Sequence, residues 1–303
     1  MPGFAPIGTL PIGAAPYVAP AAAGPSQALL LLSPVYSDAG TFSASSQVTR
    51  LPVANLQTRQ PQKKWRSLPG TAASIAIALA QPIAANALAL VAHNLSSAGL
   101  LRLRGALLQA NVTTAPAVDT GWQSAWPITG KPAIAWPNWL SLLTWSGAPA
   151  VPYWQLDIAD PSNTDGFLEA GRLILGPQWQ PSIGFDLSGT PVSFDANDQQ
   201  TKTPWGYIFT DRRSPAGGPA RVFAVQITAA NRKEVQAGIL EMQRTRGLWG
   251  DVVCCLDPGR PDDFHINSLH GVFVQKGSYP ITQNFDPDGG QWGVGTINLN
   301  ESL

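Results

Sequence analysis

The sequence predicts a mainly β protein, in which a β-sandwich is followed by a second β domain with one flanking helix. Three observations support this prediction. Short aliphatic runs that alternate with a period of two recur along the chain, as half-buried strands do. Turn-forming residues separate these runs, and 29 Gly with 28 Pro among 303 residues exclude a long helical bundle. One segment, residues 232–246, has the apolar spacing of an amphipathic helix.

Residues 1–27 form a Pro-, Ala- and Gly-rich segment without a charged side chain. Its six prolines recur every four or five residues up to Pro25 and prevent a regular helix. The segment lacks the basic start and the unbroken apolar core of a signal peptide, and it is too interrupted for a membrane span. We therefore expect an extended arm, which lies against another subunit, packs on its own chain or remains free.

The sandwich is expected to occupy residues 28–176, with turn residues such as Pro69-Gly70 between its strands. One short strand alternates Leu101 and Leu103 with arginines, so one of its faces should be solvated. The strands predicted here are Ala28–Ser33, Ala73–Leu79, Asn86–Ala92, Leu101–Leu103, Tyr153–Ile158 and Leu168–Leu175.

Residues 110–152 interrupt this pattern, because they combine five tryptophans with several prolines and have almost no periodicity. We interpret the segment as a long, ordered excursion from the sandwich. Trp136, Trp139 and Trp145 could stack on the apolar face of a sugar ring. The alternative is that they anchor the loop or a subunit interface, where aromatic residues are enriched.

The second domain is expected to occupy residues 177–303, with one helix over 232–246. Asn231 is a suitable N-cap, Ile239 and Met242 belong to the apolar stripe, and Gly247 ends the helix. The predicted strands are Trp205–Asp211, Arg221–Ala229, Asp251–Leu256, Gly271–Gln275 and Val294–Leu299.

No motif for catalysis, a cofactor or a metal is recognisable in the sequence, so we expect a protein that is not an enzyme. His93 ends an apolar strand, where a histidine usually bonds the backbone. Cys254 and Cys255 are adjacent, which fits neither a relaxed disulfide nor zinc-ligand spacing, so we expect two reduced thiols. The formal net charge is zero, which argues against binding to nucleic acid.

The chain also carries motifs that resemble those of a known family. They are the segment Leu51–Pro61 followed by Trp65-Arg66-Ser67, then His93-Asn94-Leu95-Ser96, and finally Gly171–Gly176. Together they are similar to the discoidin-like (galactose-binding-like) sandwich of tail-tip and baseplate proteins of tailed bacteriophages. The second half, with its strand 221–229, its helix and Asp251-Val252-Val253, resembles tail-tube and distal-tail proteins.

The resemblance implies a structural motif made of Asn55, Trp65, Arg66, His93, Asn94 and Arg172. Asn55 and Pro61 would shape a turn, Trp65 would pack the end of the sandwich, and Arg66 would satisfy buried carbonyl groups beside it.

The resemblance further implies a non-enzymatic structural component of a phage tail tip or baseplate, present in the virion and assembled in the host cytoplasm. It would form a homo-oligomer, a trimer or a hexamer, with other tail proteins as partners and with no cofactor, nucleic acid or membrane insertion. The alternative is a carbohydrate-binding module that recognises host-surface glycans through its loop tryptophans.

Overall fold

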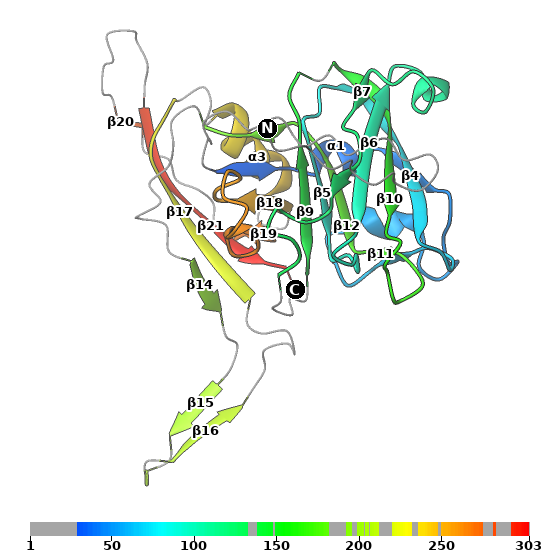
Figure 1. Ribbon diagram of the computed structural model, residues 1–303. Helices are drawn as coiled ribbons and strands as arrows, with labels where there is room; N and C mark the ends of the chain where they lie inside the picture. Colours follow the sequence, from blue (N-terminus) through cyan, green and yellow to red (C-terminus); the bar gives the residue numbers. More distant parts are fainter. Residues whose placement is uncertain are drawn as a thin grey trace, which may run out of the picture.

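The computed structural model describes residues 29–132, 138–147, 149–181, 192–195, 199–202, 204–205, 207–211, 220–231, 236–247, 250–274, 281–282 and 292–302. Within them the chain is mainly β, which confirms the predicted fold class. Three antiparallel sheets stack face to face, and helix α3 (Glu241–Arg246) covers the outer face of the third (Figure 1). No helix among these residues is long and apolar enough to span a membrane.

The first layer is a six-stranded sheet with one face in the core. Strand β10 alternates in burial, so that Trp154, Leu156 and Ile158 point inward. Gly105 lies opposite Trp154 in the register and has no room for a Cβ atom beside the indole ring. The strands are β2 (Thr41–Ala44), β4 (Ala72–Ile83), β10 (Val151–Ala159), β6 (Leu100–Ala106) and β7 (Val118–Asp119), with β8 (Gln123–Ser124) also paired to β6.

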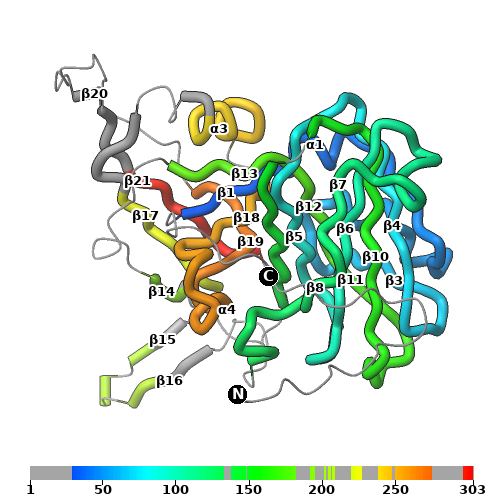
Figure 2. The backbone as a smooth tube through the Cα atoms, turned by 45° about the horizontal axis from the view of Figure 1, so that its top comes forward, coloured from blue at the N-terminus to red at the C-terminus, as the bar shows by residue number. Residues whose placement is uncertain are grey.

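The middle layer consists of β12 (Arg172–Gly176), β5 (Ala87–Val91) and β9 (Leu140–Thr144). Every residue of β5 and β12 is buried, because both faces of this sheet are covered. Leu88 and Leu90 of β5 pack into the core shared with the first layer, whereas Ala89 and Val91 pack toward the third. The middle layer therefore belongs to two cores at once, as the central position of β5 and β12 in Figure 2 illustrates.

The third layer is an eight-stranded sheet in which β18 (Asp251–Cys255) is buried on both faces. Cys255 packs against the middle layer, and Cys254 packs beneath the helix, so the two adjacent thiols lie in different cores. Both are free, as the sequence predicts. The sheet follows the order β13 (Gln178–Trp179), β1 (Leu30–Leu32), β18, β19 (Ser268–Phe273), β21 (Trp292–Glu301), β17 (Ala220–Asn231) and β14 (Val192–Asp195), with β20 (Ile281–Thr282) paired to β21.

Strand β1 pairs with β18 and β13, so residues that the sequence places in the sandwich domain contribute to the third sheet. The chain crosses back into this sheet between β12 and β13, at Gly176–Gln178, close to the predicted boundary. The two halves of the chain therefore interleave where they meet, and they share the apolar cluster between the middle and third layers.

The Trp-rich segment 110–152 is more regular than its sequence suggests, because it contains β7, β8 and β9. Strand β9 completes the middle sheet by pairing with β5. It shows no alternation because Leu143 faces one core and Leu140 faces the other, so apolar residues are needed on both sides.

The predicted helix appears as a π-helical turn, η4 (Gln236–Leu240), that continues into α3. Ile239 is fully buried on the third sheet, Met242 packs beside it, and Gly247 ends the helix with a positive φ of 60°. The side chain of Asn231 and residues 232–235, on which the predicted N-cap depends, lie outside the described residues.

Shorter elements connect these layers. They are the helical turns α1 (Val35–Asp38), η1 (Val53–Gln57), η2 (Gln109–Asn111) and α4 (Phe264–Asn267), the strand pair β3 (Trp65–Arg66) and β11 (Glu169–Ala170), and the hairpin β15 (Gln199–Lys202) and β16 (Ile208–Asp211).

Candidate functional site

Arg172 begins strand β12 with a fully buried guanidinium group. Its Nε atom donates to Asp251 Oδ2 at 2.7 Å, and its Nη1 atom lies 2.6 Å from Asp38 Oδ1. Nη1 also donates to the carbonyl oxygen of Leu56 at 3.2 Å. Arg172 thus joins the middle layer to β18 of the third sheet, to α1 and to η1.

Two further side chains extend this network. His270 of β19 lies with Nε2 3.0 Å from Asp251 Oδ2, and Arg246 of α3 donates to Asp38 Oδ2 at 2.7 Å. Burial opposes ionisation of Asp251, but the hydrogen bond with His270 and the charge of Arg172 outweigh it and hold the pKa of Asp251 well below its usual range. The group therefore remains a carboxylate that compensates the buried cation.

We predict that Arg172→Met costs about 3–5 kcal/mol of unfolding free energy, because it leaves Asp38 and Asp251 without their shared cation. The matched control is Arg102→Met, since Arg102 pairs with Asp119 at the surface of the first sheet and such pairs contribute about 0–1 kcal/mol. Urea unfolding of both variants measures the difference. Equal, small losses in both would contradict a central role for the buried network.

His93 is fully enclosed next to the Trp-rich segment. Ser141 donates its hydroxyl proton to the carbonyl oxygen of Ala125 at 2.5 Å, so His93 Nε2, 2.8 Å from the same hydroxyl oxygen, must be the donor of that pair. His93 Nδ1 accepts from the backbone N–H of Leu95 at 3.3 Å. Burial and the nearby charges of Lys131 and Lys64 lower the pKa of His93 to about 3. A neutral histidine bound in this way is not placed to act as a general base for Ser141.

The buried His93 should make the protein less stable in acid. The unfolded chain takes up a proton near the ordinary value of 6.5, whereas folded His93 remains neutral down to about 3, so stability falls as the pH drops through this window. The slope from this group approaches about 1.4 kcal/mol per pH unit. We predict that His93→Gln removes most of this slope in urea titrations between pH 6.5 and pH 4. The control His265→Gln should change it less, because His265 keeps more contact with solvent. An unchanged slope in His93→Gln would contradict the assignment.

Trp139 is one of the three tryptophans predicted as possible glycan or interface contacts. It belongs to an aromatic cluster. Its ring meets Trp126 edge to face, with 5.1 Å between ring centroids, and Trp126 meets His93 at the same distance. Lys131 Nζ lies 5.0 Å from the Trp126 centroid and 5.7 Å from that of Trp139. The faces of these rings are therefore partly occupied by the protein itself.

Trp145 lies at the opposite end of β9 and packs near Trp154, with 6.0 Å between centroids. Trp139 and Trp145 flank an extended strand with a rise of about 3.3 Å per residue, which separates them by roughly 20 Å. They do not converge on one sugar ring. Trp136 lies outside the described residues.

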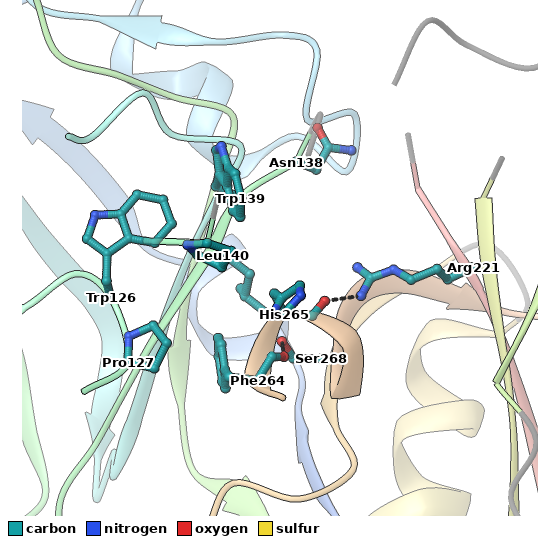
Figure 3. A pocket seen from close by; sticks show the side chains of 10 residues that line it. Trp126, Pro127, Asn138, Trp139, Leu140, Arg221, Phe264, His265 and Ser268 are labelled. Carbon is teal, nitrogen blue, oxygen red and sulfur yellow. Dashed lines mark hydrogen bonds between the residues drawn. The ribbon is translucent and has the colours of Figure 1, made fainter. Parts of the chain in front are cut away.

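A small hollow lies where this aromatic cluster faces α4 and β17 (Figure 3). Its cavity volume is about 10 Å³, enough for a single water molecule. Arg221 at its edge is held by Glu301, with Nη2 2.6 Å from Oε1, and it donates to the carbonyl oxygen of His265 at 2.5 Å. In this conformation the hollow does not accommodate a sugar. The hollow is lined by Trp126, Pro127, Pro132, Asn138, Trp139, Leu140, Arg221, Phe264, His265 and Ser268.

The remaining residues of the predicted motif organise loops at one end of the sandwich. Asn55 Nδ2 donates to the carbonyl oxygen of Lys64 at 2.8 Å, and Asn94 Nδ2 donates to that of Phe167 at 2.9 Å. Trp65 is fully buried and donates from Nε1 to the carbonyl oxygen of Ser46 at 3.2 Å.

Arg66 does not have its predicted role, which was to satisfy buried carbonyl groups beside Trp65. It pairs with Glu169 at 2.6 Å and covers the ring of Phe167, with 4.0 Å from its Cζ atom to the centroid. The reason is the pairing of β3 with β11, which places Glu169 directly opposite Arg66. This partner lies 103 residues away in sequence, so local reasoning misses it.

One strand of the hairpin β15–β16 was predicted, as Trp205–Asp211, and the structure places it at Ile208–Asp211. The hairpin extends away from the stacked sheets (Figure 1). Three of its large side chains face solvent, with exposed fractions of 87% for Trp205, 71% for Tyr207 and 62% for Ile208. Phe194 on the neighbouring β14 is 59% exposed. Among the described residues, no cluster of His, Cys, Asp and Glu is arranged to hold a metal ion.

No protein-family model matches the chain, and no curated protein matches it. Several solved structures are similar in part. One is the family 32 carbohydrate-binding module of Clostridium perfringens NanJ in complex with galactose, with a TM-score of 0.34, 13% identity, and coverage of 48% of this chain and 98% of that one. Another is a fucolectin from striped bass (Morone saxatilis) serum, with a TM-score of 0.36, 12% identity and 55% coverage of each chain. Likeness at this level does not establish what this chain binds.

Proposed function

We propose that this chain is a non-enzymatic structural subunit that assembles with copies of itself and with other proteins in a phage tail tip or baseplate. The observation that supports it best is the hairpin β15–β16, whose Trp205, Tyr207 and Ile208 are largely exposed. Aromatic residues are enriched at the centres of protein interfaces, and an exposed apolar group on a projecting element favours burial against a partner.

The stacked sheets supply a rigid base for such contacts. The middle layer shares one core with the first sheet and another with the third, and the Arg172 network ties the middle layer to the third sheet and to α1. Interfaces within a chain that are apolar and continuous resist relative motion of its parts. A continuous body of this kind suits a subunit that repeats in a symmetric ring.

The titratable groups described above have structural partners, which supports a role without catalysis. Asp251 compensates a buried arginine, and His93 is locked as a neutral donor and acceptor. Burial raises the pKa of Cys255 to about 12 and that of Cys254 well above its usual value, so neither is a reactive thiolate. The placement of this subunit in a virion tail is supported by the sequence motifs that resemble those of phage tail proteins.

We predict that Trp205→Ser weakens self-association at least tenfold, because it removes the most exposed large side chain of the hairpin without affecting the core. Sedimentation velocity of the full chain over a concentration series measures the effect. Leu108→Ser is the matched control, since Leu108 is also an exposed apolar residue, at 62%, but lies on the first layer's side of the molecule. Equal behaviour of both variants and the unmodified chain would contradict an interface at the hairpin.

A second candidate function is carbohydrate binding. It is favoured by the half-buried Trp139, whose ring adjoins Trp126 and the cation of Lys131 beside the hollow of Figure 3. Aromatic rings with polar neighbours provide the chemistry that a sugar needs.

Under this second function, Trp139→Ala should reduce binding on a glycan array at least tenfold while the sedimentation of the chain stays unchanged. Trp145→Ala serves as the control, because Trp145 lies at the far end of β9 and packs near Trp154. The absence of glycan binding by the unmodified chain, or a loss of assembly in Trp139→Ala, would instead make the aromatic cluster structural.

A further inference from the structure

A groove of about 230 Å³ lies between α1, β13 and α3, at one end of the third sheet. Figure 2 shows α3 next to β13, with α1 beside them. The groove is separate from the hollow of Figure 3 and shares none of its residues. It is lined by Ser33, Val35, Tyr36, Pro177, Gln178, Trp179, Gly238, Glu241, Met242 and Thr245.

The lining of the groove is mainly aromatic and apolar, and it contains no basic side chain. Glu241 is its acidic residue, and this carboxylate is engaged by Arg244, with 2.5 Å between Oε1 and Nη2. The groove therefore favours an uncharged occupant over an ionic one. Tyr36 and Trp179 provide the rings on which such an occupant would pack.

The groove is preformed by close packing. A Cβ atom on Gly238 would collide with the indole ring of Trp179, so this ring lies directly against the backbone of the π-helical turn. Trp179 also packs on the core beneath the helix. A ring held in this way does not have to be ordered when an occupant arrives, which lowers the cost of binding.

Two polar atoms of the lining have no hydrogen-bond partner among the described residues. They are the hydroxyl oxygen of Ser33 and the amide oxygen Oε1 of Gln178. A buried polar atom without a partner is unfavourable by about 1–3 kcal/mol. The hydroxyl has a proton to donate to a carbonyl group, and the amide oxygen accepts from N–H groups. An extended peptide offers both, because its backbone has no internal hydrogen bonds.

The chain itself contains a segment with the required chemistry. Residues 1–27 carry no charge and have a proline every four or five residues. Proline-rich segments dock in aromatic-lined grooves, because their extended conformation is set in advance and little entropy is lost on binding.

The length of this segment lets it reach a neighbouring copy of the chain. Leu29 has a φ of 70°, uncommon for a residue with a side chain, and its N–H donates to the carbonyl oxygen of Leu256 at 2.7 Å. Leu29 is therefore held in place directly before β1. Ser33 follows only about 13 Å further along the strand, whereas an extended arm of this length spans about 84 Å.

We propose that the groove of one copy binds the proline-rich arm, residues 1–27, of a neighbouring copy. This inference rests on the proposed function, since it names the contact that links subunits in the assembly. The hairpin and the arm would then join each subunit to its neighbours through two independent surfaces.

Disulfide trapping between full-length chains tests this contact. One chain carries Thr245→Cys at the exposed rim of the groove, and the other carries a cysteine in the arm at Thr9, Ala15 or Ala22. The native Cys254 and Cys255 are buried and do not compete. On mild oxidation of the mixed chains, at least one arm position should give at least tenfold more mixed dimer than a control pair with Ser162→Cys, which lies on an exposed turn.

The outcomes separate the occupants. No arm position above the control would overturn the proposal. A cross-link within a single chain of the double variant Thr245→Cys/Ala15→Cys, with none between mixed chains, would also overturn it and would place each arm in its own groove. Sedimentation of the same full-length chains distinguishes the two proposals. An intact oligomer without the cross-link would contradict the arm contact but not the proposed assembly.

Discussion

The structure depends above all on the burial of one cation, the guanidinium group of Arg172. A buried charge is tolerated only when opposite charges and hydrogen bonds surround it, and here Asp251 and Asp38 provide both. These partners come from β18 and α1, so the charge of Arg172 is satisfied only when the middle and third layers have docked. The pairing of Arg246 with Asp38 adds the helix to the same network. One buried group thus makes the docking of the middle layer, the third sheet and the helix interdependent.

The stacking of three sheets follows from strands that bury both faces. In β18, Val253 and Cys255 face the middle layer while Val252 and Cys254 face the helix side. Small residues such as Ala89 in β5 let the sheets approach closely. The result is a continuous body in which the sandwich and the second β unit share a core. A projecting apolar hairpin and an aromatic groove on such a body suit a protein whose function is to connect subunits.

Strands with one buried face could be predicted from the sequence, because alternation marks them. β4, β6 and β10 appear where the alternating runs are, although all three are longer than predicted. β9 was missed because its apolar residues face two cores and show no period of two.

The pairing of β1 with β18 could not be read locally, since more than 200 residues separate Leu31 from Cys254. Arg172 was singled out as part of a motif, but its partner Asp251 lies 79 residues away, and no local signal connects them. The exposure of Trp205 is likewise a property of the folded surface, and not of the neighbouring sequence. The predicted roles of Trp139 and Trp145 in one glycan platform depended on proximity, which the extended strand between them removes.

We propose a structural subunit of a virion tail, and the location of the chain tests this proposal most directly. Immunogold electron microscopy of particles from the producing cells, with an antibody against this chain, would provide the measurement. We predict label confined to one end of a tail, at a constant number of positions per particle. Particles without label, together with the protein found only as free chains, would contradict it.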